Sequence, residues 1–229
     1  MDILHAIIGL SSSLGRRLSA GIIERGGLVC GTWRGSPPDT AGLALSRQCD
    51  VSDLAGLERF ANECRTISDR ISLVNLAGIS RNMMSHRLEL DDWQDVIRTN
   101  LTGSWMTARA FLPGMREAGW GRIVFAGSVT GRLGVPGTSA YSASKEGLKG
   151  LARTLARENV AKGITVNCIE LGYMDAGLTH TIPQEIREGI LEDIPARRFG
   201  DPANLLETVL FLDAADYVTG AVIPLTGGL

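Results

Sequence analysis

The chain has 229 residues, of which 44% are hydrophobic and 21% are charged. This length and composition predict one compact α/β domain with a sizeable core. A formal net charge of -2 argues against the basic surface that nucleic-acid binding requires. No apolar run reaches the roughly 18 residues of a membrane helix, and the N-terminus lacks the features of a secretory signal. We therefore expect a cytoplasmic protein that binds neither nucleic acid nor membrane.

Cysteine and histidine spacing gives no sign of a metal site. The four cysteines include no CxxC pair, and the three histidines lie far apart in the sequence. We expect the cysteines to be buried reduced thiols, and we expect no metal ion.

Short apolar segments rich in β-branched residues alternate with segments of helical periodicity. We predict strands at 3–8, 28–33, 44–50, 72–76, 122–126, 165–170 and 221–225. We predict helices near 14–26, 53–67, 92–118, 139–162 and 202–213. Asp53 and Asp201 precede helical segments and are candidate N-caps.

This alternation predicts the fold class. Repeated strand–helix units indicate a Rossmann-like, doubly wound parallel sheet of about seven strands, in a single domain spanning residues 1–229. The joint at 34–42 holds two prolines and two glycines, and it is too short for a full crossover helix. We expect a reduced connection between the second and third strands.

A glycine-containing turn follows the first predicted strand and precedes the first predicted helix. Such a turn lets the backbone approach a pyrophosphate, and the helix N-terminus offers unpaired N–H groups. An ordinary tight turn would have the same pattern, so the turn alone does not identify a pyrophosphate site. The candidate pyrophosphate ligands are Gly9, Ser11, Ser12, Ser13, Leu14 and Gly15.

The end of the second predicted strand carries no carboxylate. An NAD site generally places one there to bind the ribose 2′-hydroxyl. Thr32 and Arg34 stand in that region instead, and both could bind a 2′-phosphate. NADPH/NADP is therefore favoured over NAD, although Arg34 could also be a solvated loop charge.

Tyr141 and Lys145 begin the predicted helix at 139–162 and, being four residues apart, share one of its faces. The ammonium is expected to bring the pKa of the phenol from about 10 toward neutrality. Such a phenol fits the reduction of a carbonyl, in which a proton is given to the developing alkoxide. Ser128, at the end of a predicted strand, could hydrogen-bond the same oxygen. Taken alone, the Tyr–Lys pair could also be an exposed tyrosine beside a solvated lysine.

These motifs occur together, in order, along the whole chain. The set comprises the 9–15 turn, Asp50 with Val51, the 75–78 segment, Asn100, Ser128, and Tyr141 with Lys145. The chain thereby resembles the short-chain dehydrogenase/reductase family.

The resemblance implies roles for the site residues. Ser128 would orient the substrate and Tyr141 would be the acid/base. Lys145 would bind the nicotinamide ribose and tune the phenol, and Asn100 would hold a water in a proton relay. Further residues implied at the cofactor are Asp50, Val51, Asn75, Ala77, Gly78, Gly172 and Met174.

Within the family, the chain is most similar to 3-oxoacyl-[acyl-carrier-protein] reductases, through 78–82, 87–88, 139–145 and 194–200. This likeness implies NADPH-dependent reduction of a 3-oxoacyl thioester, bound to an acyl carrier protein or coenzyme A, to the 3-hydroxyacyl thioester. Another secondary alcohol or ketone stays open as the substrate. The family pattern also implies a homo-oligomer, a tetramer. Residues 173–199 would form a substrate lid, whose apolar stripe could instead be core packing. The stripe consists of Met174, Leu178, Ile182, Ile186 and Ile190.

Several positions depart from the family pattern. They are Ile8, Ser12, Ser13, Leu76, Leu171 and Ala176. Each lost hydrogen bond would weaken cofactor binding by about 1 kcal/mol. The departures leave open a second hypothesis, a catalytically silent cofactor sensor or partner subunit, but the four catalytic residues are intact.

Overall fold

Seven parallel strands form one sheet in the computed structural model, which describes residues 2–39 and 41–229. The strands are β1 (Leu4–Ile8), β2 (Leu28–Trp33), β3 (Leu45–Gln48), β4 (Ile71–Asn75), β5 (Gly121–Ser128), β6 (Ile164–Leu171) and β7 (Val222–Leu225). Their order across the sheet is β3-β2-β1-β4-β5-β6-β7, and neighbouring strands are parallel. The predicted fold class is confirmed, and each predicted strand overlaps an observed one.

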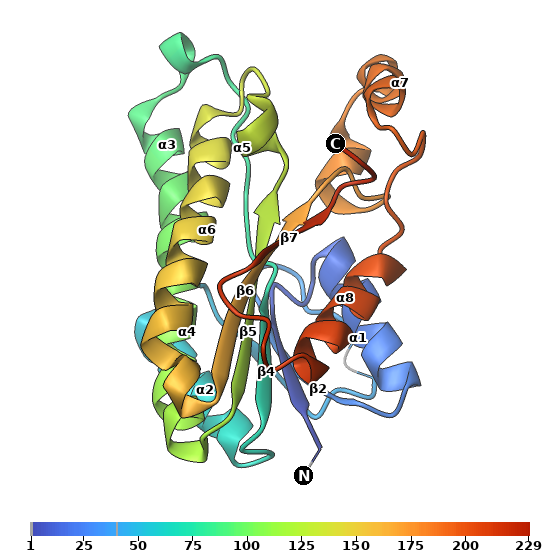
Figure 1. Cartoon of the computed structure of the whole chain (residues 1–229). Helices are drawn as coiled ribbons and strands as arrows, with labels where there is room; N and C mark the ends of the chain where they lie inside the picture. Colours follow the sequence, from blue (N-terminus) through green and yellow to red (C-terminus); the bar gives the residue numbers. More distant parts are fainter. Residues whose placement is uncertain (1, 40) are drawn as a thin grey trace.

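Helices cover both faces of the sheet (Figure 1). One face carries α2 (Leu54–Arg65), α4 (Gly103–Ala118) and α6 (Ser139–Asn159), with α3 (Leu90–Ile97) alongside. The other face carries α1 (Ser13–Glu24) and α8 (Ala203–Ala214). Shorter elements are η1 (Ser85–Arg87), α5 (Thr130–Leu133), η3 (Val160–Lys162), η4 (Gly177–Thr181) and α7 (Gln184–Asp193).

Each face of the sheet has its own apolar core, because successive side chains of a strand point to opposite faces. In β5, Ile123 and Phe125 join the core under α2, α4 and α6, whereas Val124 joins the core under α1 and α8. Every residue of β5 and β6 is buried, as expected for central parallel strands. Truncating a buried phenylalanine to alanine costs about 3–5 kcal/mol. The two strands therefore give rigid support to the groups at their ends.

The predicted helix at 92–118 is helical throughout but contains a π-helical turn. α3 ends at Ile97, α4 begins at Gly103, and the intervening turn η2 (Arg98–Thr102) is π-helical. A π-helical turn holds an extra residue, so a single helical periodicity does not describe both halves. The prediction of a helix here is confirmed, but the helical periodicity did not predict the π-helical turn within it.

Two helix starts were predicted from aspartates. Asp53 caps α2 as predicted, because its carboxylate accepts a hydrogen bond from Gly56 N at 3.0 Å. Asp201 is not the N-cap of α8. Pro202 occupies that position, which suits its fixed φ, and Asp201 Oδ1 accepts from Ala203 N at 2.8 Å.

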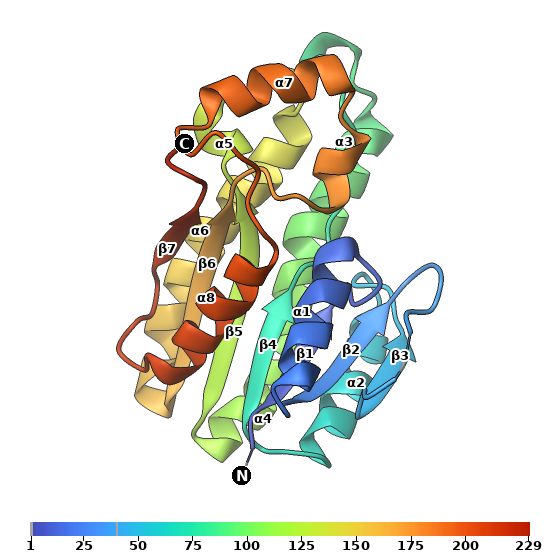
Figure 2. The ribbon, with the colours of Figure 1, turned by 90° about the vertical axis from the view of Figure 1, so that its right-hand side faces the viewer.

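The connection between β2 and β3 is reduced, as predicted, and its described residues contain no helix. Beyond this joint, the order of strands reverses between β1 and β4. Doubly wound sheets bind ligands at such a point, outside the carboxyl ends of the strands. In Figure 2, α7 lies across this edge of the sheet.

Candidate functional site

The turn after β1 is closely packed. Gly9 has a φ of +86°, and a Cβ there would lie 3.0 Å from Ala77 N. A Cβ on Gly15 would lie 2.5 Å from Gly9 O, which is closer than non-bonded atoms approach. Ser12 is the N-cap of α1 and accepts a hydrogen bond from Gly15 N at 3.0 Å. Only glycine fits at both ends of the turn, and the turn presents the N-terminus of α1 to the edge of the sheet.

The end of β2 offers one exposed cation. Thr32 is buried, and its carbonyl accepts hydrogen bonds from Gly9 N and Leu10 N. Arg34 is exposed, and its Nη1 lies 3.7 Å from a carboxylate oxygen of Asp50. Asp50 also accepts from Ser52 N and Ser52 Oγ, and although burial acts in the opposite direction, these bonds and Arg34 lower the pKa of its carboxyl. Of the two candidates, Arg34 is the side chain accessible to a phosphate.

The segment after β4 is held by buried amides. Asn75 Oδ1 accepts from Ala77 N at 3.0 Å, and its Nδ2 donates to Ser104 Oγ at 3.2 Å. Val51 is buried against Gly103 of α4. A Cβ on Gly78 would lie 3.3 Å from Lys145 Nζ. Gly78 thus allows the chain to pass close to the ammonium.

Ser128, Tyr141 and Lys145 line one cavity and form what we call the catalytic wall, after the roles that the family resemblance implies for them. Ser128 ends β5, whereas Tyr141 and Lys145 lie in the first two turns of α6. Lys145 Nζ donates to Ala126 O at 2.7 Å and lies 5.6 Å from the centroid of the Tyr141 ring. The three residues singled out from the sequence are therefore brought together.

The expected lowering of the Tyr141 pKa is wrong for this structure. Burial raises the pKa of the phenol, and a hydrogen bond with Ser128 only partly opposes the rise. Burial also lowers the pKa of Lys145 to about 8, although proximity to Cys168 favours its charged form. The sequence prediction considered only the ammonium next to the phenol, whereas desolvation dominates at both residues.

Asn100 lies in the π-helical turn and is fully buried. Its Oδ1 accepts from Ile79 N at 2.8 Å, and its Nδ2 donates to Ile79 O at 2.9 Å and Ser144 Oγ at 3.0 Å. The Asn100 backbone oxygen accepts from Ser104 Oγ at 2.6 Å. The side chain ties the segment after β4 to α6. The relay water that the family resemblance implies stays a prediction.

The cavity measures about 610 Å³ and lies between the glycine-containing turn after β1, the catalytic wall and residues 173–199, the segment predicted from the sequence to be a lid. The predicted cofactor residues that line it are Ser12, Ser13, Leu14, Gly78, Tyr141, Lys145, Gly172 and Met174. The entire predicted apolar stripe of the lid also lines it, namely Met174, Leu178, Ile182, Ile186 and Ile190. Since α7 buries none of its ten residues, its part of the stripe faces the cavity instead of a packed core.

Sequence reasoning missed several contacts around the wall. Thr130 N and Thr130 Oγ1 lie 3.3 and 3.1 Å from Ser128 Oγ, within hydrogen-bond distance. Glu170 of β6 and Lys149 of α6 form a buried ion pair. Lys149 lies one helical turn after Lys145, but nothing in the sequence pairs it with a residue on β6.

Comparisons with known proteins agree with this geometry. A family model described as enoyl-(acyl carrier protein) reductase matches residues 9–229. The 3-oxoacyl-[acyl-carrier-protein] reductase of Pseudomonas aeruginosa is 35% identical over 238 residues, covering 97% of this chain and 95% of the relative. The chain belongs to the short-chain dehydrogenase/reductase family. Other reductases with the same description, from Vibrio harveyi and Escherichia coli, are 34% and 32% identical, each over 97% of this chain and 95% of the relative.

Membership of the short-chain dehydrogenase/reductase family makes the chain an oxidoreductase with a nicotinamide cofactor. In the part of the chain that the structure describes, no helix has both the length and the apolarity to cross a bilayer. The same residues contain no cluster of three or more His, Cys, Asp or Glu side chains that could hold a metal ion. All four cysteines are buried thiols, as predicted.

Proposed function

We propose that this protein reduces a 3-oxoacyl thioester to the 3-hydroxyacyl thioester with NADPH. The observation that supports it most is the convergence of Ser128, Tyr141 and Lys145 on a cavity that also reaches the glycine turn and the apolar lid. The names of the curated relatives point to the same substrate class, an acyl chain on a carrier protein.

The residues present fit a dinucleotide. A Cβ at Gly9 or Gly15 would fill the space of the turn, and Ser12 and Ser13 border the cavity at the N-terminus of α1. These groups would hold the pyrophosphate, with Arg34 at the 2′-phosphate and Lys145 at the nicotinamide ribose. When bound, the reduced nicotinamide supplies the hydride.

Tyr141 is the proton donor in this proposal. Its raised pKa keeps the phenol protonated at neutral pH, and the proton goes to the carbonyl oxygen as carbon 3 is reduced. Ser128 donates a hydrogen bond to the same oxygen and stabilises its developing charge. Lys145, with a pKa of about 8, is largely protonated at neutral pH and stabilises the phenolate left behind.

The lid supplies the binding surface for the acyl chain. Its isoleucines and Met174 give the cavity an apolar wall, which suits a hydrocarbon chain better than a polar ketone. Carrier protein and coenzyme A differ only beyond the thioester, so both are candidate carriers.

Parallel assays of NADPH consumption test the function. The substrates are acetoacetyl-CoA, longer 3-oxoacyl carrier-protein thioesters, simple ketones, and a 2-enoyl thioester because of the description of the family model. We expect turnover of 3-oxoacyl thioesters, with kcat/KM rising with chain length. Turnover confined to enoyl thioesters or simple ketones would show that the proposed substrate class is wrong. NADPH binding with no turnover of any of them would support the sensor hypothesis.

Replacing Arg34 by Gln tests the cofactor preference. Loss of the cation should weaken NADPH binding about tenfold, equivalent to about 1.4 kcal/mol, and leave NADH binding unchanged, because only NADPH has the 2′-phosphate. The Arg47→Gln variant is the matched control, since Arg47 is an exposed arginine of β3 paired with Glu63. An equal loss for both cofactors in fluorescence titration would show that Arg34 does not read the 2′-phosphate.

We also propose that the protein is a homo-oligomer, a tetramer. Trp105 on α4 and Phe211 on α8 are large apolar side chains that this single chain leaves exposed. Light scattering that gives the 24.5 kDa mass of one chain at micromolar concentration would contradict this.

A further inference from the structure

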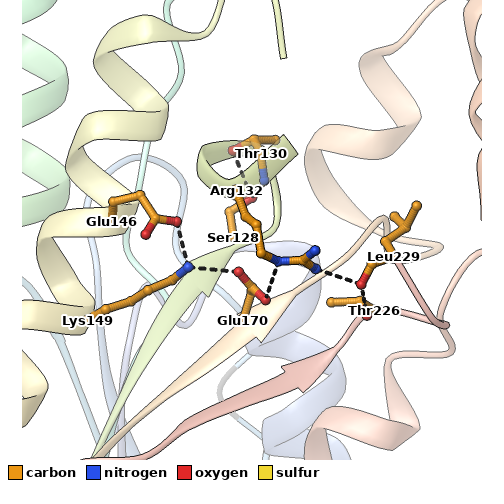
Figure 3. Close-up of polar contacts among 8 residues, drawn as sticks. All are labelled: Ser128, Thr130, Arg132, Glu146, Lys149, Glu170, Thr226 and Leu229. Atoms are coloured by element: carbon orange, nitrogen blue, oxygen red, sulfur yellow. Dashed lines mark hydrogen bonds and ion pairs between the residues drawn. The ribbon is translucent and has the colours of Figure 1, made fainter. Parts of the chain in front are cut away.

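Glu170 is a buried carboxylate next to the catalytic wall. It is 4% exposed and pairs in register with Gly127 of β5, one residue before Ser128. Its Oε1 accepts from Lys149 Nζ at 2.7 Å and its Oε2 from Arg132 Nε at 3.4 Å (Figure 3). One side chain of β6 is therefore bonded to two helices.

The first link leads to α6. Lys149 lies one turn beyond Lys145 on this helix and also donates to Glu146 at 2.5 Å. Burial lowers the pKa of Lys149, but the hydrogen bonds with Glu146 and Glu170 outweigh it and raise the pKa overall. The Lys149–Glu170 ion pair thus fixes the position of α6 along β6.

The second link leads to α5, the short helix that follows Ser128. Arg132 belongs to α5, and so does Thr130, whose amide and hydroxyl both lie within hydrogen-bond distance of Ser128 Oγ. Arg132 also donates to Leu229 O at 2.6 Å. Figure 3 shows Arg132 lying between Glu170 and Leu229.

A buried network of ion pairs is weak evidence of a role in stability. Burying ionised groups is expensive, and well-packed apolar residues of similar volume often stabilise a protein equally well or better. Two cations and two carboxylates nevertheless balance here, and they connect the two segments that carry Ser128 and Tyr141. What the network supplies beyond packing is a fixed orientation.

We propose that Glu170 is a positioning residue, which sets Ser128 relative to Tyr141 by holding α5 through Arg132 and α6 through Lys149. The inference rests on the proposed function, in which both hydroxyls act on one carbonyl oxygen. A misplacement of about 1 Å in such a pair can lower the rate about 100-fold.

The test compares two variants. Glu170→Gln removes the negative charge to which both cations are bonded and one of its two acceptor oxygens, whereas Arg132→Gln weakens only the link to α5 and leaves Glu170 paired with Lys149, so this variant should fold. We expect kcat to fall about 10- to 100-fold in both, with KM and NADPH affinity unchanged, because neither residue lines the cavity. Arg132→Lys keeps a cation and should restore part of the lost rate.

Three matched variants leave the α5 link intact. Glu146→Gln removes the other carboxylate from Lys149, and Thr226→Val removes a second contact of Leu229, since Thr226 Oγ1 donates to Leu229 O at 3.1 Å. Glu63→Gln removes the carboxylate of the exposed ion pair between Arg47 of β3 and Glu63 of α2. All three should keep the wild-type kcat. A fall in Glu146→Gln as large as in Arg132→Gln would overturn the inference, because Lys149 alone would then account for the effect.

Hydrogen exchange provides a readout that needs no substrate. The amides of Leu133 and Gly134 bond to Val129 O and Thr130 O, and they should exchange faster in Arg132→Gln and Glu170→Gln but not in Glu146→Gln. If the wild-type protein showed no turnover, the proposed function would be wrong, but the exchange rates would still show whether Arg132 and Glu170 hold α5 in place. Wild-type exchange and wild-type kcat in a folded Arg132→Gln protein would overturn the positioning role.

Discussion

The catalytic wall and the lid border the same cavity but are held in different ways. Lys145 is buried with its ammonium bonded to a strand carbonyl, and Ser128 ends a strand in which every residue is buried. In the predicted lid, α7 buries no residue, and the two side chains of the His180–Asp175 hydrogen bond are both exposed. The groups that would act on the carbonyl are thus preorganised, whereas the surface that would meet the acyl chain can adapt.

Removing the phenolic oxygen of Tyr141 should have the largest effect on the rate. Tyr141→Phe should lower kcat by about 10²- to 10⁴-fold, the range for loss of a general acid. The apolar ring packing stays, so NADPH binding by fluorescence titration should be nearly unchanged. Equal rates for the two proteins would remove Tyr141 from the mechanism, as would a variant that simply stops binding NADPH.

Ser128→Ala should come next. Loss of one donor at a developing oxyanion costs about 2.7–4 kcal/mol, measured as the ratio of kcat/KM values. Thr130→Val is the companion variant, because Thr130 contacts Ser128 but is not assigned to the carbonyl. We expect a smaller loss for it. A larger loss in Thr130→Val than in Ser128→Ala would reverse these roles.

The burial of Lys145 predicts a pH dependence of stability. Its pKa is about 8 in the folded chain against a usual 10.5, so the unfolded chain binds more protons between these values. The free energy of unfolding should therefore rise with pH, by about 1 kcal/mol from about pH 7.5 to about pH 9.

Urea unfolding of wild type and Lys145→Met at both pH values isolates this contribution, which the variant should lack. Cys168 sets the upper end of the pH range in which this rise can be measured, because burial raises the pKa of its thiol to about 11 from 9.0. Above pH 9 that thiol opposes the trend, because the unfolded state loses its proton first. A parallel rise in both proteins would mean that Lys145 is not the source.

The smallest effect should come from the lid. Ile186 is 56% exposed yet lines the cavity, so Ile186→Ser should raise KM for long acyl thioesters by up to about fivefold, or about 1 kcal/mol. The kcat for short substrates should stay the same. Ile67→Ser is the control, as Ile67 is 38% exposed just after α2 and does not line the cavity. A change in kcat in Ile186→Ser would show that the lid also positions the reacting groups.

The sequence predicts the strands and the wall well because both depend on local pattern. β-branched apolar runs mark buried strands, and residues at strand ends meet at one edge in any parallel sheet. Ser128 was placed at such a strand end, and it was assigned together with Tyr141 and Lys145 because the order of motifs along the chain resembles the family.

Properties that depend on contacts across elements could not be predicted in this way. The pKa of Tyr141 depends on how deeply the phenol is buried, which the spacing to Lys145 does not reveal. The pairing of Glu170 with Arg132 requires the register of β6 against β5. Arg34 looked like a phosphate ligand or a solvated charge, and its contact with Asp50 joins the ends of two strands that lie side by side.

The π-helical turn at Arg98–Thr102 sets the rotational phase of everything that follows it in α4. Each residue of an α-helix advances the direction of its side chain by about 100°. Deleting one residue from this turn would give a regular helix, but it would turn either Asn100 away from Ile79 or the apolar face of α4 away from the sheet. The extra residue therefore allows one long helical segment to serve two partners whose directions no single α-helix could match.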